Sequence, residues 1–148
     1  MTRINVVPVE ELSDQYLLAE YRELPRVVKQ DISVVEAPKK YCLGKGHMKW
    51  ARLHMLYTLR RYMEIWEEMK TRQFSPKYFP HDLMNLALDK YGQTFLWRSY
   101  SPTDEDLALN RRRLIEHYKP QNHTWTKRRK PNYYVERIEK DEKTDNDL

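Results

Sequence analysis

The stretch SDQYLLAEYRELPRVVK, residues 13–29, decides the fold of this chain. Four large apolar side chains recur at intervals of four, three and four residues: Leu17, Tyr21, Leu24 and Val28. This spacing places them on one side of an α-helix. Pro25 lies inside the pattern and removes one backbone hydrogen bond, so we expect a kink there rather than the end of the helix. The stretch predicts an amphipathic helix that begins at about residue 10 or 13 and ends at about residue 29.

The opposite side of this helix carries charge. Glu23 stands between Arg22 and Arg26, and Ala19 leaves space one turn earlier. An ordinary exposed face with charge pairs explains this pattern. A functional alternative is a carboxylate whose ionised form is favoured by arginines that also bind phosphates. The helix alone does not decide between the two.

Two further long helices are predicted. The first covers about residues 46–72, where large side chains repeat at alternating spacings of four and three: Met55, Leu59, Tyr62, Trp66 and Met69. As one helix it would be about 40 Å long, and its stripe is typical of a core rather than of a cofactor site. The second opens at residues 100–106, where Pro102 lies in the first turn and acidic side chains complement the helix dipole, and it ends before Pro120.

The buried side of that last helix is predicted from Leu107, Leu114 and Tyr118, and a short helix is expected from His81 to Lys90. No alternating strand pattern is evident. We therefore predict an all-α fold, a single compact domain of three main helices with irregular connections.

Length and composition restrict the class of protein. The chain has 148 residues, which is one domain's worth. Its single cysteine, Cys42, excludes an internal disulfide framework and a cysteine-based metal site, and its 5 histidines show no paired ligand spacing. No apolar run is long enough for a membrane span or a signal peptide. We expect a cytoplasmic protein, without metal or cofactor and monomeric.

The charge is unevenly distributed. Residues 1–130 carry 24 basic and 16 acidic side chains, and residues 131–148 carry 3 and 6. A body with this excess of positive charge attracts polyanions such as DNA, although a solvated basic surface is the plain alternative. We expect a helical domain over residues 1–132 and a charged, disordered tail over residues 133–148.

The N-terminus offers a nucleophile. Thr2 is small, and an initiator methionine before such a residue is normally removed, which would free the α-amine of Thr2. An α-amine has a pKa near 7.7 to 8, against about 10.4 for lysine, so at neutral pH far more of it is unprotonated and able to attack carbon. Almost every protein has such an amine and hardly any uses it, so this observation needs support from elsewhere.

Several strings resemble one family. Residues 1–5, MTRIN, and residues 19–27, AEYRELPRV, resemble the N-terminal part of the phage pyrimidine-dimer DNA glycosylases of the endonuclease V type. The resemblance continues with residues 43–47, LGKGH, and returns at residues 100–102 and 113–116. It covers the whole expected domain but not the tail.

The resemblance implies a compact helical enzyme that inserts its N-terminus into the minor groove of damaged double-stranded DNA. Such an enzyme releases the damaged base and then cleaves the abasic strand. Carried over, the Thr2 α-amine would be the nucleophile and Glu23 the acid/base carboxylate. The remaining expected DNA-binding residues are Arg3, Arg22, Arg26, Gly46, His47, Arg113, His117, Trp125 and Lys127.

Some positions depart from the family pattern. Tyr16 stands where the phage relative has a histidine, and His117 where it has a lysine. A basic run over residues 127–130 replaces aromatic residues, which favours general phosphate binding and leaves the lesion preference open. Two alternatives remain: an enzyme for other lesions, such as abasic sites or ring-opened purines, and a non-catalytic basic DNA-binding module.

Overall fold

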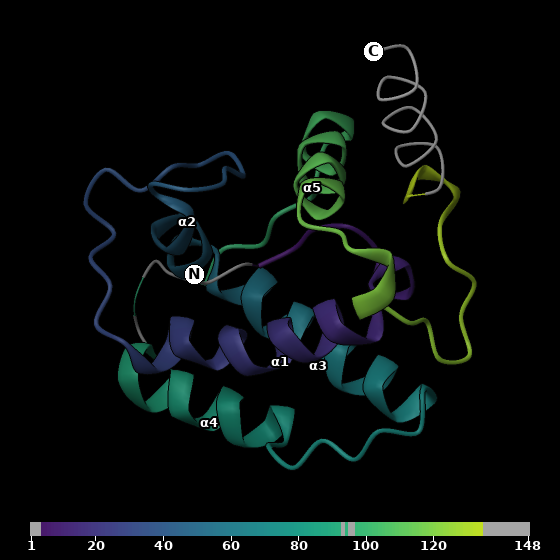
Figure 1. The fold of residues 1–148 in the computed structure, drawn as a ribbon. Helices are drawn as coiled ribbons and strands as arrows, with labels where there is room; N and C mark the ends of the chain where they lie inside the picture. The colour runs from purple at the N-terminus through teal and green to yellow at the C-terminus, as the bar shows by residue number, and fades with distance from the viewer. Residues whose placement is uncertain (1–3, 93, 95–96, 135–148) are drawn as a thin grey trace.

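The computed structural model describes residues 4–92, 94 and 97–134, and these described residues form helices and irregular connections, with no strand (Figure 1). In chain order the elements are η1 Val9–Glu11, α1 Asp14–Lys29, α2 His47–Leu53, α3 Met55–Thr71, α4 Pro80–Tyr91, α5 Asp104–Glu116 and η2 Pro120–Asn122. The all-α prediction is confirmed, and the three main helices and the one short helix expected correspond to α1–α5, because one predicted main helix is divided in two.

Helix α1 lies at the centre of the molecule, beside α3 and α4 (Figure 1). It begins where the Ser13 hydroxyl accepts a hydrogen bond from the Tyr16 N–H, and it continues through Pro25 as predicted. Leu17, Leu24 and Val28 are fully buried, and Tyr21 is partly buried. The apolar stripe therefore faces the core, which leaves the charged side of α1 toward solvent.

The last carbonyl groups of α1 are bound by side chains from two other helices. The Lys90 Nζ donates to the carbonyls of Val28 and Lys29 at 3.0 and 2.9 Å, and the Tyr91 hydroxyl donates to Val28 at 2.8 Å. The Arg52 guanidinium donates to the Val27 carbonyl. Cations near a helix C-terminus are attracted to its partial negative charge and stabilise the helix. Side chains of α2 and α4 therefore fix the end of α1.

The single helix expected over residues 46–72 is wrong, because the structure divides it into α2 and α3 at His54. His54 pairs with Trp97 in an isolated bridge, and the Tyr57 N–H donates to the Arg98 carbonyl at 3.2 Å instead of continuing the helical pattern. The Thr58 hydroxyl donates to the Ala51 carbonyl at 2.8 Å. Contacts with a distant segment of the chain, which helical periodicity does not register, interrupt the helix.

The start of α5 also differs from the prediction. Thr103 is the N-cap and forms a capping box with Asp106, so Pro102 precedes the helix rather than lying in its first turn. The capping box satisfies the first free N–H groups of the helix, and it outweighs the preference of proline for that turn. The expected short helix is present as α4.

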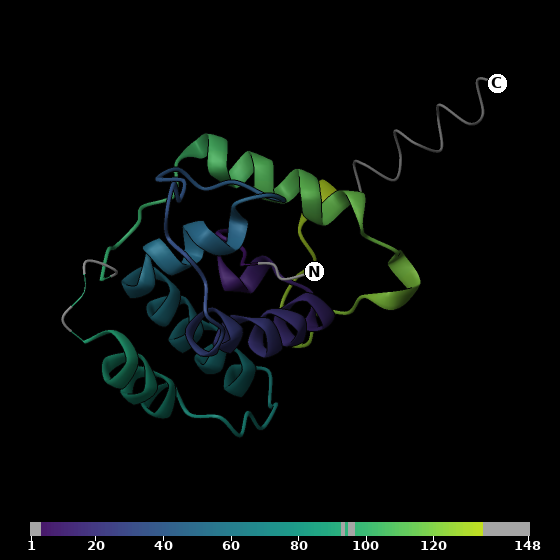
Figure 2. The same cartoon turned by 90° about the vertical axis from the view of Figure 1, so that its left-hand side faces the viewer.

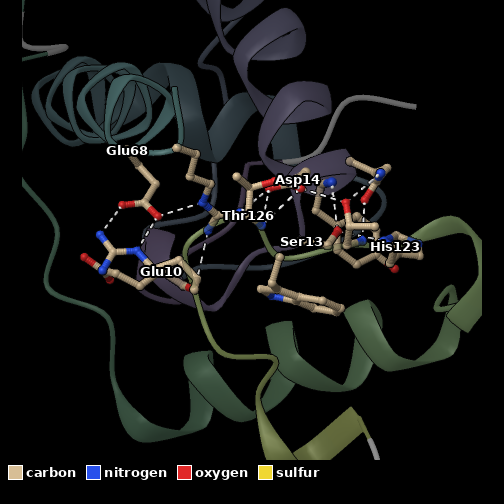
Figure 3. Close-up of polar contacts among 12 residues, drawn as sticks. Glu10, Ser13, Asp14, Glu68, His123 and Thr126 are labelled. Atoms are coloured by element: carbon tan, nitrogen blue, oxygen red, sulfur yellow. Dashed lines mark hydrogen bonds and ion pairs between the residues drawn. The ribbon is translucent and has the colours of Figure 1, made fainter. Parts of the chain in front are cut away.

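The segment after η2 packs back onto the helical body. We call residues 123–128 the C-terminal strap; Figure 3 shows Thr126 of this strap beside Asp14, with Glu68 nearby. Tyr134 is fully buried, so the packed body continues beyond the expected boundary at Asn132. The rest of the expected tail, residues 135–148, lies outside the described residues.

Within the part of the chain that the structure describes, no helix is both long and apolar enough to cross a membrane.

Candidate active site

Glu23 projects from the solvent side of α1 without being fully exposed. Its side chain keeps 21% of its accessible surface, and the Arg26 Nη1 lies 3.2 Å from both of its carboxylate oxygens. Arg26 lies one turn later and is itself about half exposed. A carboxylate in this position can exchange protons with a ligand, and its charge is balanced by a guanidinium that also faces solvent.

Arg22 lies beside Glu23 and faces a surface pocket of about 470 Å³. Aromatic and long side chains line this pocket together with Arg22: Leu18, Tyr21, Met69, Gln73 and Phe74. The Tyr21 hydroxyl accepts hydrogen bonds from the N–H groups of Lys77 and Tyr78, each at 3.0 Å, and so holds the loop that closes one wall. The pocket offers a planar ligand an apolar wall and a cationic rim.

A larger hollow of about 910 Å³ lies between α3 and residues 99–102. Its walls carry three exposed glutamates, Glu10, Glu64 and Glu67, against one exposed arginine, Arg60, and none of the residues predicted for the site lines it. Exposed carboxylates repel phosphate groups, so this hollow is a poor candidate for DNA binding.

The first described residues pass through the interior, between α1, α3 and α5 (Figure 2). Ile4, Asn5 and Val7 are all buried, and side chains from several elements bond to their backbone. The Ile4 N–H donates to the His47 Nε2 at 2.7 Å, and the Tyr41 hydroxyl donates to the Ile4 carbonyl at 2.9 Å. These hydrogen bonds therefore fix the backbone of the segment relative to α2 and to the loop before it.

Glu20 lies on α1 one turn before Glu23, and unlike Glu23 it is buried. It accepts a hydrogen bond from the Asn5 Nδ2 at 2.7 Å and forms an ion pair with the Arg61 Nε at 2.8 Å. Arg61 is fully buried too, and although burial alone would lower its pKa, the negative charge of Glu20 raises that pKa above the usual arginine value. The ion pair ties α1 to α3, and the hydrogen bond from Asn5 ties residue 5 to the same carboxylate.

Gly46 and His47, both predicted to bind DNA, have internal roles in the structure. Gly46 is the N-cap of α2 with φ of 91°, a left-handed conformation that favours glycine. His47 is buried; its Nε2 accepts from Ile4, so its other nitrogen carries the proton and donates to the Cys42 carbonyl at 2.8 Å. The imidazole thus holds the N-terminal segment rather than facing solvent.

Arg113 and His117 lie toward the end of α5. Arg113 is one turn after Asn110, whose carboxamide bonds to residues 5–7, so α5 places Arg113 on the turn next to the N-terminal segment. His117 is the exposed C-cap of the helix. The neighbouring Tyr16 hydroxyl donates its hydrogen to the Leu114 carbonyl at 2.7 Å, so that hydrogen is not offered to a phosphate.

The last two residues predicted to bind DNA, Trp125 and Lys127, both lie in the C-terminal strap but have different environments. The Trp125 indole donates to the Glu11 carbonyl at 3.0 Å and its ring packs against Tyr118, so Trp125 is part of the body. Lys127 is exposed. Within the basic run, Arg128 forms two hydrogen bonds to Glu68, at 2.7 and 2.8 Å, and is therefore committed to the fold.

Thr2 and Arg3 lie outside the described residues. What the structure brings together on α1 is the exposed group Arg22, Glu23 and Arg26, with the anchored segment 4–7 bonded to the same helix through Glu20. Among the described residues, no three His, Cys, Asp or Glu side chains are grouped so that they could hold a metal ion.

The sequence does not directly indicate the buried polar residues around the N-terminal segment, which include Asn5, Glu20, Arg61 and Asn110. A signal for one of them exists, because Glu20 lies three residues after Leu17 and four before Leu24, at the edge of the apolar stripe. A carboxylate that a helix carries into the core needs a charged or hydrogen-bonding partner, which points to a buried arginine elsewhere.

The described residues form a helical body whose central helix, α1, carries a carboxylate and two arginines on its solvent side. The family model for pyrimidine dimer DNA glycosylases matches residues 1–81, more than half of the chain. The chain belongs to the pyrimidine dimer DNA glycosylase family, so it is an enzyme of DNA repair and its substrate is DNA. The matched region contains α1 with Glu23 and ends in α4; Arg113, His117, Trp125 and Lys127 lie beyond it.

Proposed function

We propose that this protein is a pyrimidine-dimer glycosylase that also cleaves the resulting abasic strand, with the α-amine of Thr2 as nucleophile and Glu23 as acid/base group. The observation that carries the proposal is that one helix, α1, both carries Glu23 and binds the N-terminal segment. Glu23 is partly exposed on α1, and the N-terminal segment is bonded to α1 one turn earlier, through Asn5 and Glu20.

In the first step the unprotonated amine attacks C1′ of the damaged nucleotide. The bond between C1′ and the base breaks, and the base leaves with the bonding electrons. The sugar ring then opens to a protonated Schiff base between C1′ and the amine. Glu23 stabilises the positive charge that develops on the sugar and transfers a proton at the ring oxygen.

In the second step the Schiff base withdraws electrons from C2′, which makes its hydrogen acidic. Glu23 removes that proton, the electrons form a C2′–C3′ double bond, and the C3′–oxygen bond breaks with loss of the 3′ phosphate. Arg22 and Arg26 offset the charge of the phosphates beside the carboxylate. All of these steps use protein groups alone.

Recognition of a dimer fits the pocket beside Arg22. Two linked pyrimidines distort the duplex, which lowers the cost of kinking it and of extruding a base. The resemblance implies that the extruded base lies opposite the lesion, and we propose that it enters the pocket lined by Tyr21 and Phe74, where aromatic side chains favour stacking. A base analogue opposite the lesion should then become more fluorescent on binding.

Borohydride trapping tests the proposal. A duplex that carries a pyrimidine dimer or an abasic site is incubated with the enzyme and reductant, and the covalent protein–DNA product is measured. Wild-type protein should be trapped, and peptide mapping should place the link on the terminal residue. Protein whose terminal amine is acetylated should bind DNA but not be trapped.

Retention of Met1 offers a second control. Replacing Thr2 by a large residue without an amine, such as Leu, prevents removal of the methionine, and trapping should then be lost. If acetylated protein is trapped as well as wild type, a lysine side chain rather than the terminus is the nucleophile.

Lesion preference separates this proposal from the enzymatic alternatives. Duplexes with a pyrimidine dimer, an abasic site or a ring-opened purine should be cleaved in that order of preference. Cleavage of abasic duplexes alone would reduce the activity to the lyase step. Family membership decides against the non-catalytic module, and we expect the enzyme to act on double-stranded DNA as a monomer.

A further inference from the structure

The buried segment Ile4–Val7 is held by side chains rather than by a neighbouring strand. Six of its backbone groups bond to side chains from the loop before α2 and from α2, α3 and α5. The partners are Tyr41, His47, Tyr57, Arg61 and Asn110. A segment fixed from so many elements has one position in the folded protein.

Two asparagines, Asn5 and Asn110, determine which groups in this hydrogen-bond network donate and which accept. The Asn110 Oδ1 accepts from two consecutive N–H groups, those of Val6 and Val7, at 2.7 and 3.0 Å. Its Nδ2 therefore faces the Asn5 Oδ1, at 2.8 Å, and the Asn5 Nδ2 in turn donates to Glu20 at 2.7 Å. Each amide supplies a donor on one side and an acceptor on the other, and both are buried.

We propose that Asn5 and Asn110 are positioning residues for the terminal nucleophile. The inference rests on the proposed function. Residue 2 is three residues from Asn5, a chain length of about 10 Å at most. Glu23 is about 4.5 Å along the helix axis from Glu20, to which Asn5 is bonded. Fixing residue 5 at Glu20 therefore limits how far from Glu23 the amine can lie.

This confinement explains why so much polar surface is buried here. An amine at the end of a free chain would sample many positions far from the carboxylate, and misplacement of about 1 Å can cost about 100-fold in rate. Apolar side chains would have filled the same space without requiring matched partners. The hydrogen bonds of the two amides are directional, because each one joins a particular donor to a particular acceptor. They therefore prevent the segment from sliding lengthwise as well as from moving sideways.

Asn5→Asp tests the inference with almost no change in side-chain shape. The new carboxylate would still accept from Asn110 but would face Glu20 with a like charge and no donor. We expect the single-turnover rate of borohydride trapping to fall about 100-fold. The dissociation constant for a duplex with a reduced abasic-site analogue should remain close to that of wild type, because the DNA-facing residues are unchanged.

Glu20→Gln in the same chain should rescue that variant. The side-chain amide introduced by Glu20→Gln then donates to the carboxylate at position 5, so the hydrogen bond is restored with its donor and acceptor exchanged. The two side chains together again carry one negative charge. Most of the lost trapping rate should return. Asn85→Asp, an exposed site on α4, makes the same chemical change away from the segment and should trap at the wild-type rate.

If Asn5→Asp does not fold, Asn5→Ala removes the amide without adding charge and carries the same expected loss of trapping rate. Labelling with a pyridinecarboxaldehyde reagent, which reacts with terminal amines, checks that the nucleophile is present in each variant. A wild-type rate in a folded Asn5 variant would overturn the positioning role and leave the proposed function intact. If wild-type protein itself is not trapped, the proposed function fails, and the positioning role fails with it.

Discussion

Two glutamates one turn apart on α1 have opposite environments. Glu20 is 1% exposed and receives hydrogen bonds from Asn5 and Arg61. Glu23 keeps about a fifth of its side-chain surface and, among the described residues, forms one ion pair, to an arginine that is itself half exposed. The same residue type on the same helix thus serves once inside the core and once at its surface.

The difference in burial shows which of the two carboxylates can reach a bound ligand. A group that already accepts several short hydrogen bonds in the core cannot reach a ligand, and losing its charge would leave Arg61 buried without a partner. A partly exposed carboxylate next to a surface arginine can reach a sugar, and a bound phosphate can compete for that arginine. Burial assigns Glu20 to structure, and Glu23 is the carboxylate that we propose for the reaction.

Glu23→Gln should have the largest effect on activity. Removing the group that we propose transfers protons should lower strand scission by about 10²–10⁴-fold, measured in single turnover on an abasic duplex. Lesion binding and the melting temperature should change little, because the amide keeps the size of the side chain and the site is at the surface.

Glu20→Gln is the matched comparison one turn earlier on the same helix. It should lower the melting temperature clearly, since it leaves the buried Arg61 beside a neutral group. Scission by Glu23→Gln at the wild-type rate would remove the catalytic assignment. A Glu20→Gln variant as stable as wild type would show that burial does not distinguish the two carboxylates.

Arg61→Leu sharpens the comparison from the other side of the ion pair. It leaves Glu20 buried and without its guanidinium, which should cost about 3–5 kcal/mol of the free energy of unfolding, measured by urea denaturation. Arg60→Leu is the natural control, because the neighbouring Arg60 is exposed on the same helix. Equal losses in the two variants would mean that the buried pair contributes nothing particular.

Much of this fold follows from local pattern. The periodicity of residues 17–28 predicts α1 and its buried side, and it places Glu23 and Arg26 together on the solvent side, where the structure has them. The break at His54 could not be predicted this way, because its cause is a pairing with Trp97, 43 residues further along the chain. The roles of His47 and Asn110 depend on a segment near the N-terminus that reaches them only in three dimensions.

Asp14, at the start of α1, is a third carboxylate on this helix and adds a pH-dependent test. Burial alone would raise its pKa, but hydrogen bonds from Thr124, Thr126 and Arg72 outweigh that effect and lower the pKa below its usual value (Figure 3). A lowered folded-state pKa gives stability that is present above the unfolded value of about 3.9 and is lost as pH falls through the folded value.

Asp14→Asn should therefore cost about 1.5–3 kcal/mol of unfolding free energy at neutral pH. The difference between wild type and variant should shrink as pH falls below about 4, which urea unfolding at several pH values would measure. A difference that stays constant down to acidic pH would mean that the charge of Asp14 does not contribute.

Arg26→Gln should have the smallest effect on stability, because it breaks the exposed ion pair of Glu23 rather than the buried ion pair of Glu20. Ion pairs between exposed side chains are screened by water and salt, and this one should contribute at most about 1 kcal/mol to the free energy of unfolding. Its effect should appear in DNA binding instead. If Arg26 contacts a phosphate, the plot of log affinity against log salt concentration should become less steep by about one unit. Lys70→Gln, an exposed cation on α3 that stacks over Trp66, should leave that slope unchanged. Equal slopes for Arg26→Gln and wild type would confine Arg26 to its pairing with Glu23, because a cation that meets no phosphate releases no counterion from the DNA.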